Sequence, residues 1–86
     1  MKQPDYLQGM THENEILDAL GLLCPLPVLK ARKRLKPLAS GRVLEVHADD
    51  PAAVVDIPHF CHEAGHELLE IRDNPQHQIY LIRKGG

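Results

Sequence analysis

The stretch Gly21-Leu22-Leu23-Cys24-Pro25-Leu26-Pro27 joins an apolar segment to a basic one and predicts a junction between a strand and a helix. Proline suits the first position of a helix, because its missing N–H would have no partner there and its fixed φ is already helical. We therefore predict that a helix begins at Pro25 and that Cys24 is its N-terminal cap. Gly21 would end the preceding strand.

The predicted position of Cys24 favours a reactive sulfur. Unpaired backbone N–H groups and the positive end of the helix macrodipole would point at it, and Lys30, Lys33 and Arg34 would add positive charge along the helix. A free cysteine titrates near ~8.5, and such surroundings lower the pKa to ~7 or below. We therefore expect a thiolate nucleophile at neutral pH. The alternative is an inert thiol at an ordinary helix start.

The residues around Cys24 limit the kind of sulfur chemistry. A dithiol oxidoreductase needs a resolving cysteine three positions on, and Pro27 occupies that position. A cysteine protease needs an activating histidine and an orienting residue around a substrate cleft, for which so short a chain has little room. A single exposed thiolate without a resolving partner is suited to holding a group and passing it on.

Length and composition indicate one small domain. The chain has 86 residues and a formal net charge of −2, which argues against a dedicated nucleic-acid binder. No apolar leader segment is present near the N-terminus, and no apolar run is long enough to cross a bilayer. We expect a cytoplasmic protein without membrane association, with residues 1–14 as a flexible tail and 15–86 as the single domain.

The pattern of apolar residues predicts six elements in the order βαβαββ. The second helix is interrupted by Pro58 and ends at Gly65, where a left-handed C-cap belongs. The simplest architecture is an α+β two-layer sandwich with both helices packed on one face of a mixed four-stranded sheet. The predicted strands are 15–20, 43–48, 67–72 and 78–84. The first predicted helix is 25–36, and residues 51–64 are either a short turn that runs into a main helix or one kinked helix.

Apolar stripes at helical spacing predict which faces reach the core. The stripes are Val28, Ala31, Leu35 and Leu38 in the first helix, and Val54, Ile57, Cys61 and Ala64 in the second. In the strand 43–48, Leu44, Val46 and Ala48 share one face. We expect a monomer, although a sheet face exposed around Tyr80 and Ile82 would leave dimerisation open.

Two groups of polar residues suggest chemistry that we consider and set aside. His59, Cys61, His62 and His66 resemble a set of metal ligands, but the helical stripe turns Cys61 into the core and the two neighbouring histidines away from it. We therefore expect no metal site and a buried Cys61. Asp49 and Asp50 could form an acid/base pair, but helix capping accounts for Asp50.

The helix after Cys24 carries five cationic residues, at positions 30, 32, 33, 34 and 36, and no acidic one. Such a face is either solvated or a contact for a partner or RNA. Leu26 projects toward the same outer face beside the sulfur, and this combination would suit an acidic-rimmed partner. Leu26, Lys30, Lys33 and Arg34 are therefore the candidate partner-binding residues.

The motif at the junction resembles the opening of the TusA (SirA-like) family of small sulfur-carrier proteins. The resemblance begins with Leu17-Asp18-Ala19-Leu20-Gly21 and Cys24-Pro25-x-Pro27-Val28. It continues to the C-terminus and spans about residues 15–86, close to TusA proper. The further matching segments are Ala48-Asp49-Asp50-Pro51-Ala52, Asp56-Ile57-Pro58, Phe60-Cys61, Gly65-His66-Glu67-Leu68 and Tyr80-Leu81-Ile82-Arg83-Lys84-Gly85-Gly86.

The resemblance implies a sulfurtransferase that works as a persulfide carrier and has the same two-layer fold. Cys24 would accept sulfur from a cysteine desulfurase and relay it to an acceptor protein of a sulfur-relay complex. That relay would serve 2-thiolation of wobble uridine in tRNA, or molybdenum-cofactor biosynthesis. No cofactor beyond the transient cysteine persulfide and no direct nucleic-acid contact are expected.

The sequence departs from the family pattern beside the sulfur. Leu26 replaces an acidic residue of several close relatives, and Leu23 replaces a basic one. These departures bear on the choice of partner. The alternative function is a non-catalytic module that binds RNA or a protein through the basic helix, with Cys24 incidental.

Overall fold

The computed structural model describes residues 14–86 and shows the predicted order βαβαββ. The predicted tail lies outside the described residues, apart from Asn14. Within 14–86, no helix has the length and apolar character needed to cross a membrane. The elements are β2 (Glu15–Asp18), α1 (Leu26–Leu35), β3 (Val43–Ala48), α2 (Ala53–Ala64), β4 (Glu67–Asp73) and β5 (Gln78–Arg83).

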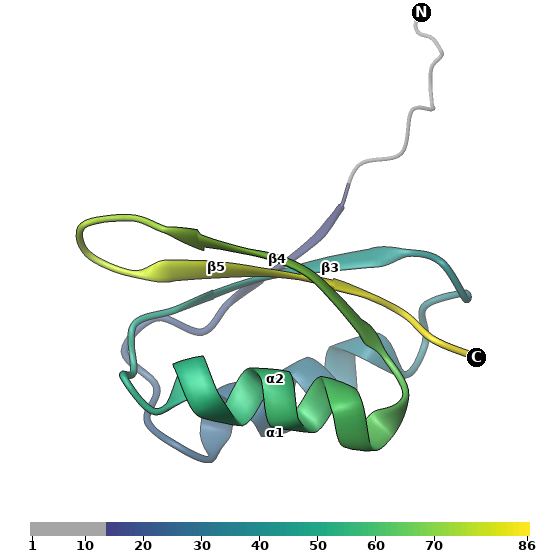
Figure 1. The fold of residues 1–86 in the computed structure, drawn as a ribbon, viewed down its shortest axis with the longest axis horizontal. Helices are drawn as coiled ribbons and strands as arrows, with labels where there is room; N and C mark the ends of the chain where they lie inside the picture. Colours follow the sequence, from purple (N-terminus) through teal and green to yellow (C-terminus); the bar gives the residue numbers. More distant parts are fainter. Residues whose placement is uncertain (1–13) are drawn as a thin grey trace, which may run out of the picture.

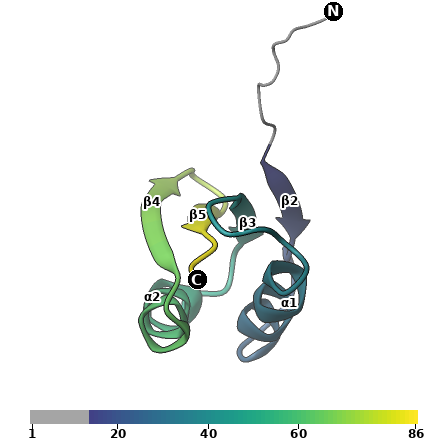
Figure 2. The same cartoon turned by 90° about the vertical axis from the view of Figure 1, so that its right-hand side faces the viewer.

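The four strands form one mixed sheet in the order β2-β3-β5-β4. β2 runs parallel to β3, and the other two pairings are antiparallel. Parallel neighbours need a crossover connection, and α1 provides it between β2 and β3. Both helices lie on the same side of the sheet (Figures 1 and 2). The predicted α+β two-layer sandwich is therefore confirmed.

The core lies between the sheet and the helices. In β3, alternate residues are fully buried, as predicted for a strand with one face covered. The α1 stripe is also confirmed, because Ala31 and Leu35 are buried while Val28 and Leu38 pack against the core. The core side chains of β3 are Leu44, Val46 and Ala48.

The predicted stripe of α2 is wrong at two of its four positions. Val54 is 48% exposed, and Ala64 is also exposed. Residues 51 and 52 form a turn that runs into the helix, which is the first of the two predicted alternatives, and the helix continues through Pro58. The buried face of the helix contains Ala53, Ile57, Phe60 and Cys61.

The expectation of a sheet face exposed around Tyr80 and Ile82 is also wrong. Tyr80 pairs with Val46 and Ile82 with Leu44, and all four side chains are fully buried beneath the helices. Because side chains alternate across a strand, the outer face of β5 carries the residues that neighbour Tyr80 and Ile82 in the strand, and not these two. These two residues therefore give no support to a dimer.

Gly65 ends α2 in the predicted left-handed conformation, with φ of 79°. The N–H groups of Gly65 and His66 both donate to the carbonyl of Cys61. Gly85 packs against this turn and donates its N–H to Nδ1 of His66 at 3.0 Å. A Cβ at Gly85 would lie 1.8 Å from the Gly65 carbonyl oxygen, so the close approach requires glycine.

Candidate functional site

Cys24 lies in the loop between β2 and α1, immediately before the helix cap. The helix begins at Leu26 with Pro25 as its N-cap, so the prediction of Cys24 as the cap is wrong by one residue. Pro27 lies in the first turn of α1, where the missing N–H of proline breaks no helical hydrogen bond, and its ring is buried. The side chain of Cys24 is exposed.

Two aspartates from the loop between β3 and α2 hold the cysteine loop in place. The N–H of Cys24 donates to Oδ2 of Asp50 at 2.6 Å, and the N–H of Gly21 donates to Oδ1 of Asp49 at 3.0 Å. Asp50 is only 8% exposed, and its other oxygen accepts the N–H of Ala52. The prediction that Asp50 caps the second helix is wrong, because the N-cap of α2 is Ala52 and no side chain caps the helix. The Asp50 carboxylate instead holds the turn before α2 and positions the backbone of Cys24.

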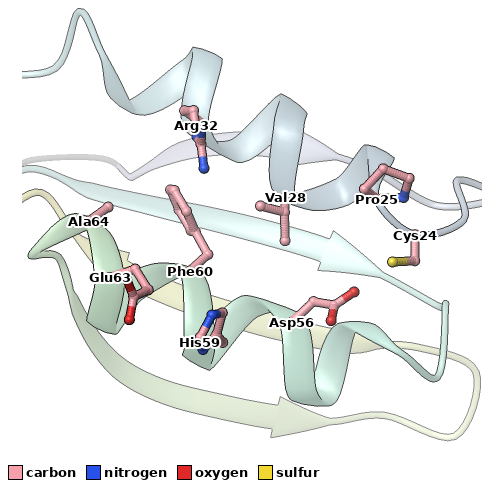
Figure 3. A pocket seen from close by; sticks show the side chains of 9 residues that line it. All are labelled: Cys24, Pro25, Val28, Arg32, Asp56, His59, Phe60, Glu63 and Ala64. Atoms are coloured by element: carbon pink, nitrogen blue, oxygen red, sulfur yellow. The ribbon is translucent and has the colours of Figure 1, made fainter.

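Cys24 stands at one end of a groove of about 640 Å³ between α1 and α2 (Figure 3). The Cys24 sulfur and the Asp56 carboxylate are directed toward each other across that end of the groove. The groove thus opens beside the candidate reactive atom. Its lining consists of Cys24, Pro25, Val28, Arg32, Asp56, His59, Phe60, Glu63 and Ala64.

The expected lowering of the Cys24 pKa is wrong. A hydrogen bond from the thiol to Asp56 raises the pKa of Cys24, and partial desolvation and the negative charges of Asp56 and Asp50 raise it further. Few helix N–H groups are available to oppose this, because prolines 25 and 27 have none and the N–H of Leu26 donates to the Leu23 carbonyl. These effects favour the protonated form of Cys24 over the thiolate.

The far end of the groove carries further charged groups that the sequence interpretation did not assign. The guanidinium carbon of Arg32 lies 5.4 Å from the centroid of the Phe60 ring, within the range of a cation–π contact. His59 and Glu63 are exposed along the α2 rim. Asp56, His59 and Glu63 are three and four positions apart, so they share one face of the helix. Nothing in the sequence indicated that this face lies opposite Cys24.

The candidate partner-binding residues lie in two different environments. Leu26 is 44% exposed, and Lys30 and Lys33 are also exposed, as predicted. Arg34 instead forms an ion pair with Glu15 at 2.7 Å and donates to the carbonyl of Ile16. It therefore joins α1 to β2. Lys30, Lys33 and Arg34 nevertheless lie together, because all three line a shallow hollow beside Leu17.

The histidines near the end of α2 and Cys61 do not converge. Cys61 is 2% exposed in the core, as predicted, and burial raises the pKa of its thiol to about 11. His59 and His62 lie on the exposed side of the helix. Among residues 14–86, no three side chains of His, Cys, Asp or Glu form a group that could hold a metal ion.

Comparisons with known proteins agree with this architecture. A family model described as "Sulfurtransferase TusA" matches residues 15–84. The putative sulfur carrier protein YrkF of Bacillus subtilis (strain 168) is 41% identical over 71 residues, which are 83% of this chain and 38% of that protein. The chain thus spans well under half of that relative. The crystal structure of a SirA-like protein from Desulfitobacterium hafniense is similar, with a TM-score of 0.71, 26% identity and coverage of 83% of this chain and 97% of that one.

Proposed function

The chain belongs to the TusA sulfurtransferase family, and on this basis we propose that it is a sulfur carrier in which Cys24 holds the sulfur as a persulfide. The observation that carries the proposal is the placement of the two thiols. Cys24 is exposed beside an open groove, whereas Cys61 is buried in the core. Only Cys24 can meet the reactive sulfur of another protein, and Cys61 cannot act as its resolving cysteine.

The proposed reaction is a transfer of one sulfur atom between cysteines. The Cys24 sulfur attacks the outer sulfur of a persulfide on the donor, and a new S–S bond forms as the donor's S–S bond breaks. The donor cysteine leaves with the bonding electron pair and takes up the proton that Cys24 loses. In the second step a thiolate of the acceptor attacks the outer sulfur, a new S–S bond forms as the S–S bond on Cys24 breaks, and the Cys24 sulfur leaves with the electron pair and takes up the proton that the acceptor thiol lost.

We propose a cysteine desulfurase as the donor and a sulfur-relay protein as the acceptor, in the cytoplasm, where thiols remain reduced. The destination proposed first is 2-thiolation of wobble uridine in tRNA, and the second is molybdenum-cofactor biosynthesis. The alternative is a module that binds RNA or a protein through the basic α1 helix, on which two of the five cationic residues already have a partner within the chain. Arg34 is paired with Glu15, and Arg32 lies over Phe60.

Intact-protein mass spectrometry tests the carrier function. The protein is incubated with a cysteine desulfurase and free cysteine, and Cys24→Ser and Cys61→Ser are treated in parallel. We expect the wild type and Cys61→Ser to gain the mass of one sulfur that a reductant removes, and Cys24→Ser to gain none. Absence of loading on Cys24 with both a desulfurase and inorganic polysulfide would disprove the carrier function.

A further inference from the structure

The carboxylate of Asp56 is directed toward the Cys24 sulfur across one end of the groove (Figure 3). It is half-buried in the first turn of α2, and its interaction with the thiol is the largest of the causes that raise the pKa of Cys24. None of the ion pairs formed within residues 14–86 includes Asp56. An unpaired carboxylate beside a sulfur that must become an anion opposes the reaction.

The other charged groups around the groove do not offset this charge. Asp50 adds a second negative charge near the sulfur, and both of its oxygens accept backbone N–H groups. On α1, the guanidinium of Arg32 lies over the Phe60 ring, two helical turns from Cys24. On α2, His59 and Glu63 follow Asp56 along the rim. The end of the groove at Cys24 is therefore acidic, although α1 is a basic helix.

The groove combines apolar and charged side chains in its lining. Its volume of about 640 Å³ lies within the range of ligand pockets. Pro25, Val28, Phe60 and Ala64 supply apolar surface, and the polar groups lie at the rims. An apolar side chain can fill such a groove, but an apolar side chain alone would leave Asp56 desolvated and unpaired.

We propose that the groove binds a segment of the sulfur-relay partner that places a lysine or arginine against Asp56, next to the partner's own reactive sulfur. The inference rests on the proposed carrier function. The partner would carry a cation next to its reactive sulfur, whereas the basic α1 helix by itself suggested a partner with an acidic surface.

The arrangement makes the reactivity of Cys24 depend on the partner. A cation beside Asp56 offsets the negative charge, so the pKa of Cys24 falls when the partner binds and the thiolate forms in the complex. In the free protein the thiol keeps its proton and reacts slowly with unrelated disulfides and oxidants. Asp56 is thus a specificity-determining residue that favours loading and unloading within a complex.

Methanethiosulfonates of opposite charge test the proposal without a partner. The Cys24 thiolate attacks the sulfenyl sulfur of the reagent, a disulfide forms and methanesulfinate leaves with the electron pair. The trimethylammonioethyl reagent carries a positive charge and the sulfonatoethyl reagent a negative one. The rate for each is divided by its rate with 2-mercaptoethanol, and intact mass shows that the adduct is on Cys24 by its absence in Cys24→Ser.

We expect the cationic reagent to react about tenfold faster than the anionic one after this normalisation. Asp56→Asn should abolish most of that preference. Glu63→Gln is the matched control, because it removes one carboxylate from the same helix rim two turns away, and it should keep the preference. High salt should reduce the preference in the wild type.

Equal normalised rates in the wild type would overturn the proposal, as would a preference that survives in Asp56→Asn or disappears equally in Glu63→Gln. The proposed function is tested separately by sulfur loading from polysulfide. If Cys24 loads sulfur but shows no preference for the cationic reagent, the cationic partner segment is wrong and the carrier function stands. If the preference is present but no sulfur loads, the carrier function fails.

Discussion

Cys24 and Cys61 illustrate how strongly a cysteine depends on its immediate surroundings. Both thiols have a raised pKa, but for different reasons, because carboxylates act on Cys24 and burial acts on Cys61. Only Cys24 is exposed, so only the pKa of its thiol can respond to another molecule that binds beside it. Asp56 is the first of the groups that raise the pKa of Cys24, and Asp50 adds to its effect.

The pH dependence of alkylation tests the role of Asp56. Because the carboxylate stabilises the protonated thiol, the rate of Cys24 alkylation by iodoacetamide should rise with pH through a midpoint above that of an ordinary cysteine. Asp56→Asn removes the negative charge, so its midpoint should shift to lower pH and its rate at neutral pH should increase. Glu63→Gln should retain the wild-type profile. An unchanged profile in Asp56→Asn would show that the carboxylate does not control the thiol.

At the scale of elements, the site is built from two loops that meet at one end of the sheet. The loop after β2 carries Cys24, and the loop after β3 carries Asp49 and Asp50, whose carboxylates accept the N–H groups of Gly21 and Cys24. β2 and β3 are parallel neighbours, so their carboxyl ends lie together. Hydrogen bonds to backbone N–H groups then fix the cysteine loop without using its side chain.

The opposite end of the molecule depends on the contact between Gly85 and the turn at Gly65. Gly85→Ala should destabilise the fold by about 1–3 kcal/mol, because its Cβ would overlap the Gly65 carbonyl oxygen. Gly86→Ala is the matched control, since a Cβ there meets nothing within 4 Å. Urea unfolding of both variants measures the difference. Equal stability of the two variants would contradict the close packing.

At the scale of the whole molecule, two surfaces flank Cys24. The groove lies between α1 and α2, and the outer face of α1 carries Leu26. A carrier meets a donor and an acceptor in turn. Separate surfaces around one sulfur allow each partner to make contacts of its own.

Leu26→Glu tests whether the outer face of α1 selects the acceptor. The side chain is 44% exposed, so the free energy of unfolding should change by less than about 0.5 kcal/mol. We expect transfer to the acceptor to slow more than loading from the donor, because the new charge lies outside the groove. Mass spectrometry of the persulfide over time measures both steps. The matched control is Val55→Glu, which makes the same kind of change at a 71% exposed position on α2 and should leave both rates unchanged.

An equal effect of Leu26→Glu on loading and on transfer would show that the outer face does not distinguish the partners. An effect of Val55→Glu as large as that of Leu26→Glu would point to overall charge as the cause. Either result would leave the groove as the remaining candidate for partner selection.

Much of the architecture could be predicted from local patterns. Alternation in β3 and helical spacing in α1 identified their buried faces, and Gly65 marked the end of α2. These features depend on residues close together in the chain, so the sequence displays them directly. The boundary error at Cys24 arose because proline fits more than one position of a first turn.

The sequence by itself determined which atom is the candidate carrier and which fold presents it, because the Cys-Pro junction and the apolar periodicities are local properties. Only the tertiary structure decided the charge around that atom. Asp56 faces Cys24 because both helices pack on one side of the sheet, and 32 positions separate the two residues in the chain. Since no local pattern records which faces of two helices meet, the sequence predicted a thiolate beside cations, whereas the packing placed the sulfur beside a carboxylate that raises its pKa.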